Sequence, residues 1–359
     1  MKAILIFRLF KLVILTAVSL MGPTVTRAQN DDADFKWLKK SVDSILLNAE
    51  QEGFSGTILL RQDDAHTLLY KGYGYSDCNL KKKTQRDMIY DIGSITKMIT
   101  TVAVLRLVQN QKLSLDQKVS DFIAGWPEDK KDISVLQLLT HSSGLKESLG
   151  LDEDTVITKE GFIEKVKGSK LLFHPGDSVQ YSNTGYTILG YIIEQVANMP
   201  YEAYVKRELF DPLGIKKMGY SIPNWKKNEM VCGQLNKNPW GSTNNYFGVN
   251  GPSPYLFANG GMMANASELS RFFDALFKKE LLPTKLENMM VSKLIRKTKT
   301  GNSIFYTSGS NLIFTSEYYC WMNRGISVVL LTNNSEYPKE KVGRQILRLT
   351  EDFINSNKK

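Results

Sequence analysis

Residues 34–52 and 339–354 carry apolar side chains at helical spacing, three to four residues apart. This spacing gathers apolar side chains on one side of a helix, so both segments are predicted to be helices with one buried side. The apolar positions are Leu38, Val42, Ile45 and Leu46 in the first segment, and Val342, Ile346, Leu347 and Phe353 in the second.

β-branched and aromatic residues form short runs near both ends of the chain, where they predict strands. Two runs follow the first helix and three precede the last one. Signals between residues 94 and 269 are mostly helical, interrupted by loops rich in glycine, proline and asparagine. The predicted strands are residues 54–60, 67–75, 303–307, 311–322 and 325–332.

This order predicts one domain, residues 29–359, with an α/β fold of the α+β type. An antiparallel sheet is flanked by the N- and C-terminal helices and has an inserted all-helical region. The sheet part is expected at about residues 35–93 and 285–359, and the helical part at about 94–284. The helical part can lie against one edge of the sheet and form a cleft, which is a common place for a small-molecule site.

The N-terminal segment has a different character. Lys2, Arg8 and Lys11 flank and interrupt an apolar run, and the small residues up to Ala28 resemble a cleavage site. These features predict a secretory signal peptide over residues 1–28. The alternative is an uncleaved anchor helix, for which the apolar run is short. In both cases the rest of the chain is expected to be periplasmic or secreted, with no membrane contact beyond the export segment.

The chain of 359 residues has a formal net charge of +9, but four basic residues lie in the export segment, which holds no acid. The remaining +5 describes a mildly basic surface. Nucleic-acid binding would need a concentrated basic face with interleaved aromatic residues. The sequence has no such stretch, so no nucleic-acid partner is expected.

The three cysteines, Cys78, Cys232 and Cys320, are scattered, so one disulfide can form in an oxidising compartment and one thiol is left over. The three histidines are isolated as well, and no pair has the spacing of metal ligands on a helix. We therefore expect no metal and no cofactor.

Residues 94–97, Ser-Ile-Thr-Lys, open a helix with regular apolar spacing. Positions three apart lie on one face of a helix, so the amine of Lys97 can reach the hydroxyl of Ser94. A serine needs an adjacent base to act as a nucleophile, and a lysine serves only if burial or a nearby cation keeps it neutral. The N–H of Ser94, at a helix start, could also help to hold an oxyanion.

This S-x-x-K pattern is weak by itself, because residues 143–146, Ser-Gly-Leu-Lys, match it too. We interpret that second match as a chance occurrence in a loop. Ser94 also has a purely structural interpretation, as an ordinary N-cap worth about 1 kcal/mol of helix stability.

A second group, Tyr181-Ser182-Asn183, precedes an apolar helix predicted at residues 184–197. A phenol beside a Ser/Lys pair can relay a proton to the leaving group, and the Asn183 side chain can donate to and accept from a substrate amide. The structural alternative is that Asn183 caps the helix while Tyr181 packs against it.

The third group is expected on a strand after the helical part, opposite the serine. Residues 307–310, Thr-Ser-Gly-Ser, are the candidate. Gly309 would let substrate backbone approach closely, and the N–H of Ser310 would be a second oxyanion donor. The alternative is a simple turn between two strands.

Taken in order, these groups resemble those of serine β-lactamases and penicillin-binding proteins. The chain is similar to the class C β-lactamase-related serine hydrolases over roughly residues 35–354. The resemblance implies a β-lactamase/transpeptidase-like fold and an acyl-enzyme mechanism, with Ser94 as nucleophile, Lys97 as proton acceptor and Tyr181 as third member. It is carried by residues 90–97, 138–145, 181–186, 211–215 and 260–262.

One position departs from the family pattern, because Thr307 stands where Lys or His is usual. A cation there would bind a carboxylate and help to keep Lys97 neutral, and charged hydrogen bonds are worth about 1.5–3 kcal/mol against about 1 for neutral ones. The resemblance therefore implies hydrolysis of an ester, an amide or a D-amino-acid peptide rather than strong β-lactamase activity.

The alternative is a non-catalytic protein of the same fold that binds its ligand without turnover. In both cases the partner is a small molecule or a peptide, and no oligomeric state is predicted. The residues expected to contact it, besides the catalytic group, are Asn183, Thr307, Gly309 and Ser310.

Overall fold

The computed structural model describes residues 22–63, 65–151, 155, 157–221, 223–226, 228–235, 238–241, 252–291, 294–311, 313–334, 337 and 339–357. The predicted signal peptide, residues 1–28, lies mostly outside the described residues, and its cleavage stays a prediction. Over the described parts of the chain, no helix combines the length and the apolar character needed to cross a bilayer.

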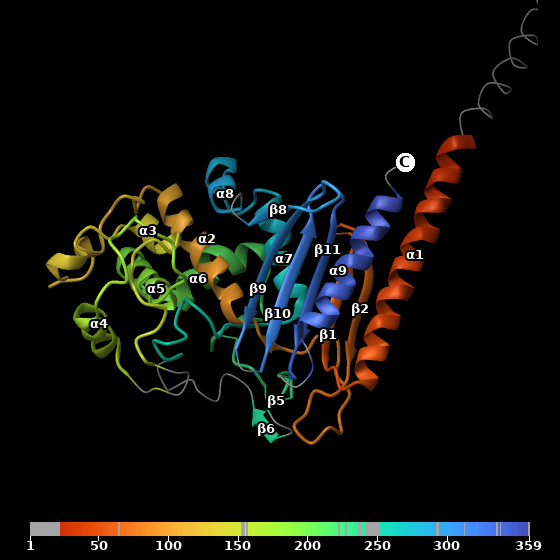
Figure 1. Ribbon diagram of the computed structural model, residues 1–359, viewed down its shortest axis with the longest axis horizontal. Helices are drawn as coiled ribbons and strands as arrows, with labels where there is room; N and C mark the ends of the chain where they lie inside the picture. Colours follow the sequence, from red (N-terminus) through yellow and green to blue (C-terminus); the bar gives the residue numbers. More distant parts are fainter. Residues whose placement is uncertain are drawn as a thin grey trace, which may run out of the picture.

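A six-stranded antiparallel sheet forms the centre of the molecule, with the strand order β2-β1-β11-β10-β9-β8 (Figure 1). Its strands come from both ends of the chain, as predicted, and β1 pairs directly with β11. The sheet confirms the predicted α+β class. The strands are β1 (Gly56–Arg61), β2 (Thr67–Tyr73), β8 (Ile295–Lys297), β9 (Ser303–Ser310), β10 (Thr315–Trp321) and β11 (Ile326–Thr332).

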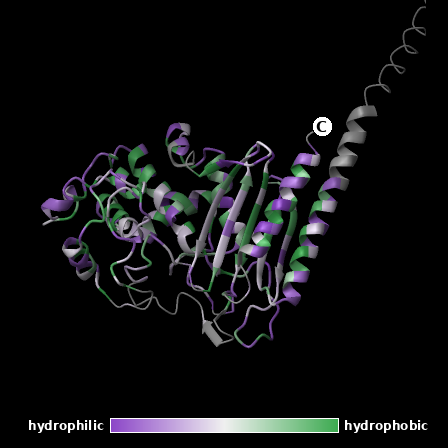
Figure 2. Cartoon of the chain, viewed as in Figure 1, coloured by the Kyte–Doolittle hydropathy of each residue, from purple (hydrophilic) through white to green (hydrophobic). Residues whose placement is uncertain are grey.

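Helices α1 (Gly22–Gln51) and α9 (Lys339–Ser356) cover one face of this sheet. Their apolar sides bury Leu38, Val42 and Ile346 against the strands, because apolar residues recur there at helical spacing. In Figure 2, hydrophilic and hydrophobic bands alternate along α9, as expected for a helix with one buried side. Helix α1 begins earlier than residue 34, where its apolar spacing starts.

The helical region lies against the other face and continues beyond the β8 edge of the sheet (Figure 1). Its centre is the pair α2 and α5, which are mostly buried and pack on each other. The α-helices are α2 (Thr96–Gln109), α3 (Val135–Leu139), α4 (Lys159–Gly168), α5 (Asn183–Ala197), α6 (Tyr201–Val205), α7 (Ala266–Phe277) and α8 (Thr284–Val291). Shorter helical turns are η1 (Gly93–Ile95), η2 (Val119–Asp121), η3 (Glu128–Lys130), η4 (Lys206–Phe210) and η5 (Asp211–Leu213).

A small second sheet connects the start of the helical region with later parts of the chain. It has the order β3-β7-β4, with β3 (Tyr90–Asp91), β4 (Met218–Gly219) and β7 (Met263–Ala264). Since β7 lies between the other two strands, residues near 92, 220 and 262 are held in one place. A separate hairpin is formed by β5 (Gly233–Leu235) and β6 (Asn238–Gly241).

Of the three cysteines, Cys78 and Cys232 form a disulfide, and their Cα atoms are 5.2 Å apart. Cys320 is a free, buried thiol in β10. The disulfide thus joins two segments that are 154 residues apart in the sequence.

Candidate active site

Ser94 lies in the turn η1, directly before helix α2, where two other side chains meet its hydroxyl. The phenol oxygen of Tyr181 is 2.6 Å from Ser94 Oγ, and Lys97 Nζ is 3.1 Å away. The helix start has no side-chain cap, so Ser94 is not the N-cap that the structural interpretation required. Ser94, Lys97 and Tyr181, which come from two of the predicted groups, therefore form one hydrogen-bonded cluster.

The amine of Lys97 is buried, with only 6% of the residue exposed. Burial disfavours the charged form and lowers the pKa of Lys97 to about 7, although the carboxylate of Glu147 opposes this shift. Lys97 Nζ also donates to the backbone oxygen of Asn259 at 2.6 Å. Without any cation at position 307, burial alone can therefore supply a neutral amine near pH 7.

Tyr181 is held at the surface of the cluster, with 38% of the residue exposed. Its ring packs on the imidazole of His141, with ring centres 4.7 Å apart, and His141 also contacts the ring of Tyr186. Lys97 Nζ lies 4.7 Å from the centre of the Tyr181 ring. Burial raises the pKa of Tyr181 to about 12, so this phenol keeps its proton and can donate it.

His141 is an imidazole whose charge and tautomer are fixed by its surroundings. Burial and the nearby Lys97 lower the pKa of His141 to about 4. Its Nδ1 accepts a hydrogen bond from the N–H of Ser182 at 3.1 Å, so the neutral ring carries its proton on Nε2. The ring is thus a neutral support for Tyr181.

Asn183 begins helix α5, and its neighbour Ser182 caps that helix by accepting from the N–H of Gly185 at 3.0 Å. The structural alternative for Asn183 as the cap is therefore wrong. The side-chain oxygen of Asn183 is buried without a hydrogen-bond partner among the described residues. The backbone N–H of Asn183 donates to the backbone oxygen of Glu147 at 3.1 Å, which fixes the helix start beside the cluster.

Residues 307–310 lie at the end of strand β9 rather than in a turn. This end packs on the Ser94 segment so closely that a Cβ on Gly309 would lie 2.5 Å from the N atom of Ser94 and closer still to the Ile92 oxygen. The carboxylate of Asp91 accepts from the N–H of Gly93 at 2.5 Å and from the side chain of Asn311 at 3.0 Å. The Asp91 side chain thereby links the backbone of Gly93, next to Ser94, to Asn311, the residue after Ser310.

Thr307 is half-buried and shares a side of β9 with Phe305, because side chains alternate along a strand. Phe305 belongs to the core that includes α2, so Thr307 faces the helical region. It brings a hydroxyl and no charge to this side of the strand.

The second S-x-x-K match, residues 143–146, is not helical. Ser143 is buried, and its hydroxyl accepts from the N–H of Leu145. This agrees with the interpretation of the match as a chance occurrence in a loop.

Three residues of the cluster, His141, Glu147 and Asn259, were not among the predicted site residues. His141 and the glycines that follow Asn259 lie in stretches that carried the family resemblance, which was the only signal for them. Among the described residues, His, Cys, Asp and Glu side chains form no group that could hold a metal ion.

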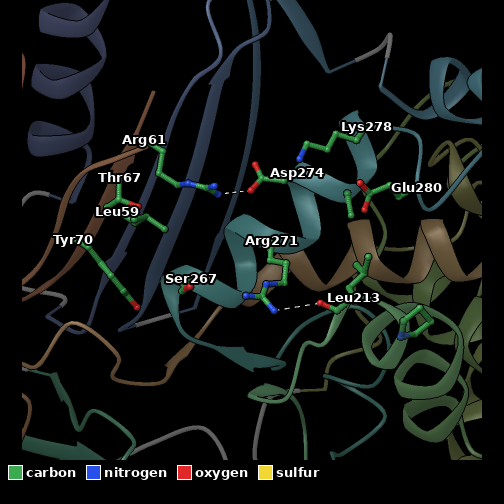
Figure 3. Close-up of a pocket in the computed structure, with 12 residues that line it drawn as sticks. Leu59, Arg61, Thr67, Tyr70, Leu213, Ser267, Arg271, Asp274, Lys278 and Glu280 are labelled. Carbon is green, nitrogen blue, oxygen red and sulfur yellow. Dashed lines mark hydrogen bonds and ion pairs between the residues drawn. The ribbon is translucent and has the colours of Figure 1, made fainter. Parts of the chain in front are cut away.

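A polar cavity of about 450 Å³ lies elsewhere, between β1, β2 and α7 (Figure 3). Three of its charged side chains have partners in the chain: Arg61 forms an ion pair with Asp274 and donates to Ser270, and Arg271 donates to the backbone oxygen of Leu213. None of the predicted site residues lines it. These contacts join α7 to the sheet and give the cavity a structural explanation.

The chain matches known proteins over most of its length. Residues 37–350 match the family described as Beta-lactamase. Protein flp of Staphylococcus aureus (strain NCTC 8325 / PS 47) is 30% identical over 204 residues, which cover 54% of this chain and 41% of flp. The matched stretch is therefore less than half of that relative's length.

Two solved structures share the fold. The octameric penicillin-binding protein homologue from Pyrococcus abyssi has a TM-score of 0.72 at 23% identity, over 87% of this chain and 77% of that chain. The D-amino acid amidase from Ochrobactrum anthropi SV3, complexed with L-phenylalanine, has a TM-score of 0.74 at 22% identity, over 89% of this chain and 99% of that chain. These two matches confirm the expected fold, and the family match over residues 37–350 confirms the resemblance.

Proposed function

Because this chain belongs to the beta-lactamase family of serine hydrolases, we propose that it hydrolyses an ester, an amide or a D-amino-acid peptide through an acyl-enzyme on Ser94. One observation carries the proposal: the Ser94 hydroxyl contacts both the buried amine of Lys97 and the phenol of Tyr181. A nucleophile, a base and a proton donor are then present at one point.

In the first step neutral Lys97 takes the proton of Ser94 Oγ, which attacks the substrate carbonyl carbon. The backbone N–H groups of Ser94 and Ser310 donate to the resulting oxyanion. Tyr181 passes a proton to the leaving oxygen or nitrogen as its bond to carbon breaks, and recovers one from Lys97. Attack by water on the acyl-enzyme, with the proton transfers reversed, then releases the acid and restores Ser94.

The proposed substrate is neutral at the end that meets β9. Thr307 can donate one hydrogen bond but offers no charge to a carboxylate, so β-lactams and free peptide C-termini lose a charged contact. The D-amino acid amidase named above shares the fold, and an amide substrate of that kind has no carboxylate. The side-chain oxygen of Asn183 is buried and has no hydrogen-bond partner among the described residues, so an amide N–H of a substrate that reaches it would satisfy it.

The test is labelling of the purified protein with a fluorescent fluorophosphonate, which reacts covalently with activated serines. We expect labelling of the wild type and of Ser143→Ala, and none of Ser94→Ala. Ser143→Ala is the matched control, since Ser143 also precedes a lysine by three residues. Equal labelling of wild type and Ser94→Ala would refute the proposal.

A second candidate function, ligand binding without turnover, is favoured by Thr307 alone. It predicts stoichiometric labelling or binding with no release of product. Steady turnover of a nitrophenyl ester or a D-amino-acid amide, abolished in Ser94→Ala, would eliminate it.

We also propose that the protein is exported. The N-terminal pattern supports a signal peptide, and the disulfide between Cys78 and Cys232 suits an oxidising compartment. N-terminal sequencing of the extracytoplasmic protein should begin near Gln29. Full-length protein confined to the cytoplasm would contradict export.

A further inference from the structure

The backbone oxygen of Asn259 makes the shortest hydrogen bond of the Lys97 amine, 2.6 Å against 3.1 Å to Ser94 Oγ. We propose that Tyr220 is a positioning residue, which holds this carbonyl toward Lys97 and thereby sets the direction and basicity of the amine. The inference rests on the proposed function of Lys97 as the base.

The hydroxyl of Tyr220 is bonded on both sides of Asn259. It accepts from the N–H of Ala258 at 3.0 Å, and it lies 2.8 Å from the oxygen of Gly260 and 3.1 Å from that of Leu256. Tyr220 is only 1% exposed, so water cannot replace these bonds. One buried hydroxyl therefore fixes the residues that precede and follow the carbonyl.

The backbone between these contacts is strained. Ala258 has a φ of 60°, in the left-handed region, which is unfavourable for a residue with a Cβ. Its oxygen accepts from Thr100 Oγ1 at 2.6 Å. A strained residue keeps its conformation only where the surroundings impose it, and here the Tyr220 and Thr100 bonds do so.

The small sheet of β3, β7 and β4 connects the segments that carry Tyr220 and Ser94. Tyr220 follows β4 directly, β7 follows the Asn259 segment, and β3 precedes Ser94. Because β7 pairs with both β3 and β4, the backbone next to Tyr220 is held in the same sheet as the segments next to Asn259 and Ser94.

The bond to Asn259 has two consequences for the amine. When Lys97 is neutral, donating one N–H to the carbonyl leaves its lone pair free for the Ser94 proton. The carbonyl also stabilises the protonated amine, because hydrogen bonding to the charged form favours that form. Loss of the Tyr220 hydroxyl would release the carbonyl, so proton transfer would slow and the amine would lose its proton at lower pH.

The experiment measures fluorophosphonate labelling rates between pH 5 and 9 for wild type, Tyr220→Phe and Tyr204→Phe. We expect Tyr220→Phe to lower the plateau rate about tenfold, as a misplaced catalytic group does, and to move the acidic midpoint to lower pH. Tyr204→Phe is the matched control, because this tyrosine is buried and its hydroxyl has no partner among the described residues. It should keep the wild-type profile.

Thermal unfolding is recorded for each variant, and Thr100→Val, which removes the bond to Ala258, provides a second route if Tyr220→Phe does not fold. A lower Tm with an unchanged pH midpoint would show a merely structural role and overturn the inference. Equal labelling of the wild type and of Ser94→Ala would instead overturn the proposed function. The failure of the inference and the failure of the proposed function can therefore be told apart.

Discussion

Lys97 and Thr307 are two residues that set the charge of the candidate site, beside the carboxylate of Glu147. Lys97 is a buried amine whose pKa lies near 7, and Thr307 is a hydroxyl where the family usually places a cation. The usual cation would lower the pKa of the lysine by charge repulsion, and here desolvation by burial does so instead. The site therefore combines an amine that loses its proton near neutral pH with an uncharged side chain at position 307.

The pKa of Lys97 predicts how labelling of Ser94 depends on pH. The neutral fraction of Lys97 grows with pH, so the rate should rise through about pH 7 to a plateau. His141 does not contribute in this range, since its pKa is about 4. Stopped-flow labelling with a fluorophosphonate measures the profile, and a midpoint near pH 4 would contradict the assignment of Lys97 as the base.

The same shift affects stability. The pKa of Lys97 in the folded protein is below that of the unfolded chain, so between about pH 7 and 10.5 the unfolded state binds the extra proton. Stability contributed by this group should therefore rise with pH across that window and fall as pH drops toward 7.

Thr307→Lys should restore recognition of a carboxylate. We expect acylation by benzylpenicillin to increase about tenfold relative to a neutral nitrophenyl ester, because a charged bond replaces a neutral one. Ser308→Lys is the matched control, since it adds the same charge one residue further along, on the opposite side of β9. Equal gains in both variants, measured as second-order acylation rates, would indicate a general charge effect and refute the role of position 307.

Among the residues of the site, the sequence best predicted those whose relative positions follow from local helix geometry. Lys97 reaches Ser94 because three residues along a helix return to the same face. Tyr181 and Ser310 come from distant segments, so only their likeness to family motifs placed them nearby. Asn259 was missed because a backbone carbonyl has no residue type by which to find it.

At the scale of elements, the end of β9 packs against the turn η1 at Gly309. A Cβ on Gly309 would collide with the backbone of Ile92 and Ser94. Gly309→Ala should therefore shift the strand from Ser94 and lower the labelling rate at least tenfold, by moving one oxyanion donor. Gly168→Ala is the control, because its Cβ would meet no atom within 4 Å. Full labelling of both variants would contradict the predicted contact.

Elements with a regular apolar pattern were predicted close to their observed bounds, as α9 and β11 show. The short strands β3, β4 and β7 were not predicted, because two residues are too few to display a period. The start of α1 was also missed, since its first part lacks the apolar spacing on which the prediction relied. Residues 307–310 extend β9, although their small polar side chains equally suit a turn.

On the scale of the whole molecule, the disulfide closes a loop of more than 150 residues. We expect Cys78→Ser with Cys232→Ser to lower the free energy of unfolding by about 2–5 kcal/mol, because the cross-link restricts the unfolded chain. Thermal unfolding with and without a reductant measures this. An unchanged Tm in the double variant would contradict a stabilising role, and Cys320→Ser provides the single-thiol comparison.

The pairing of β1 with β11 also constrains the order of events during biosynthesis. Strand β1 is synthesised first but pairs with β11, which is synthesised last, and Ser94 is made long before Ser310. A partly synthesised chain therefore carries the serine and the lysine without the strand that completes their surroundings. The arrangement of Ser94, Lys97 and β9 is therefore completed only after the C-terminal strands have been synthesised.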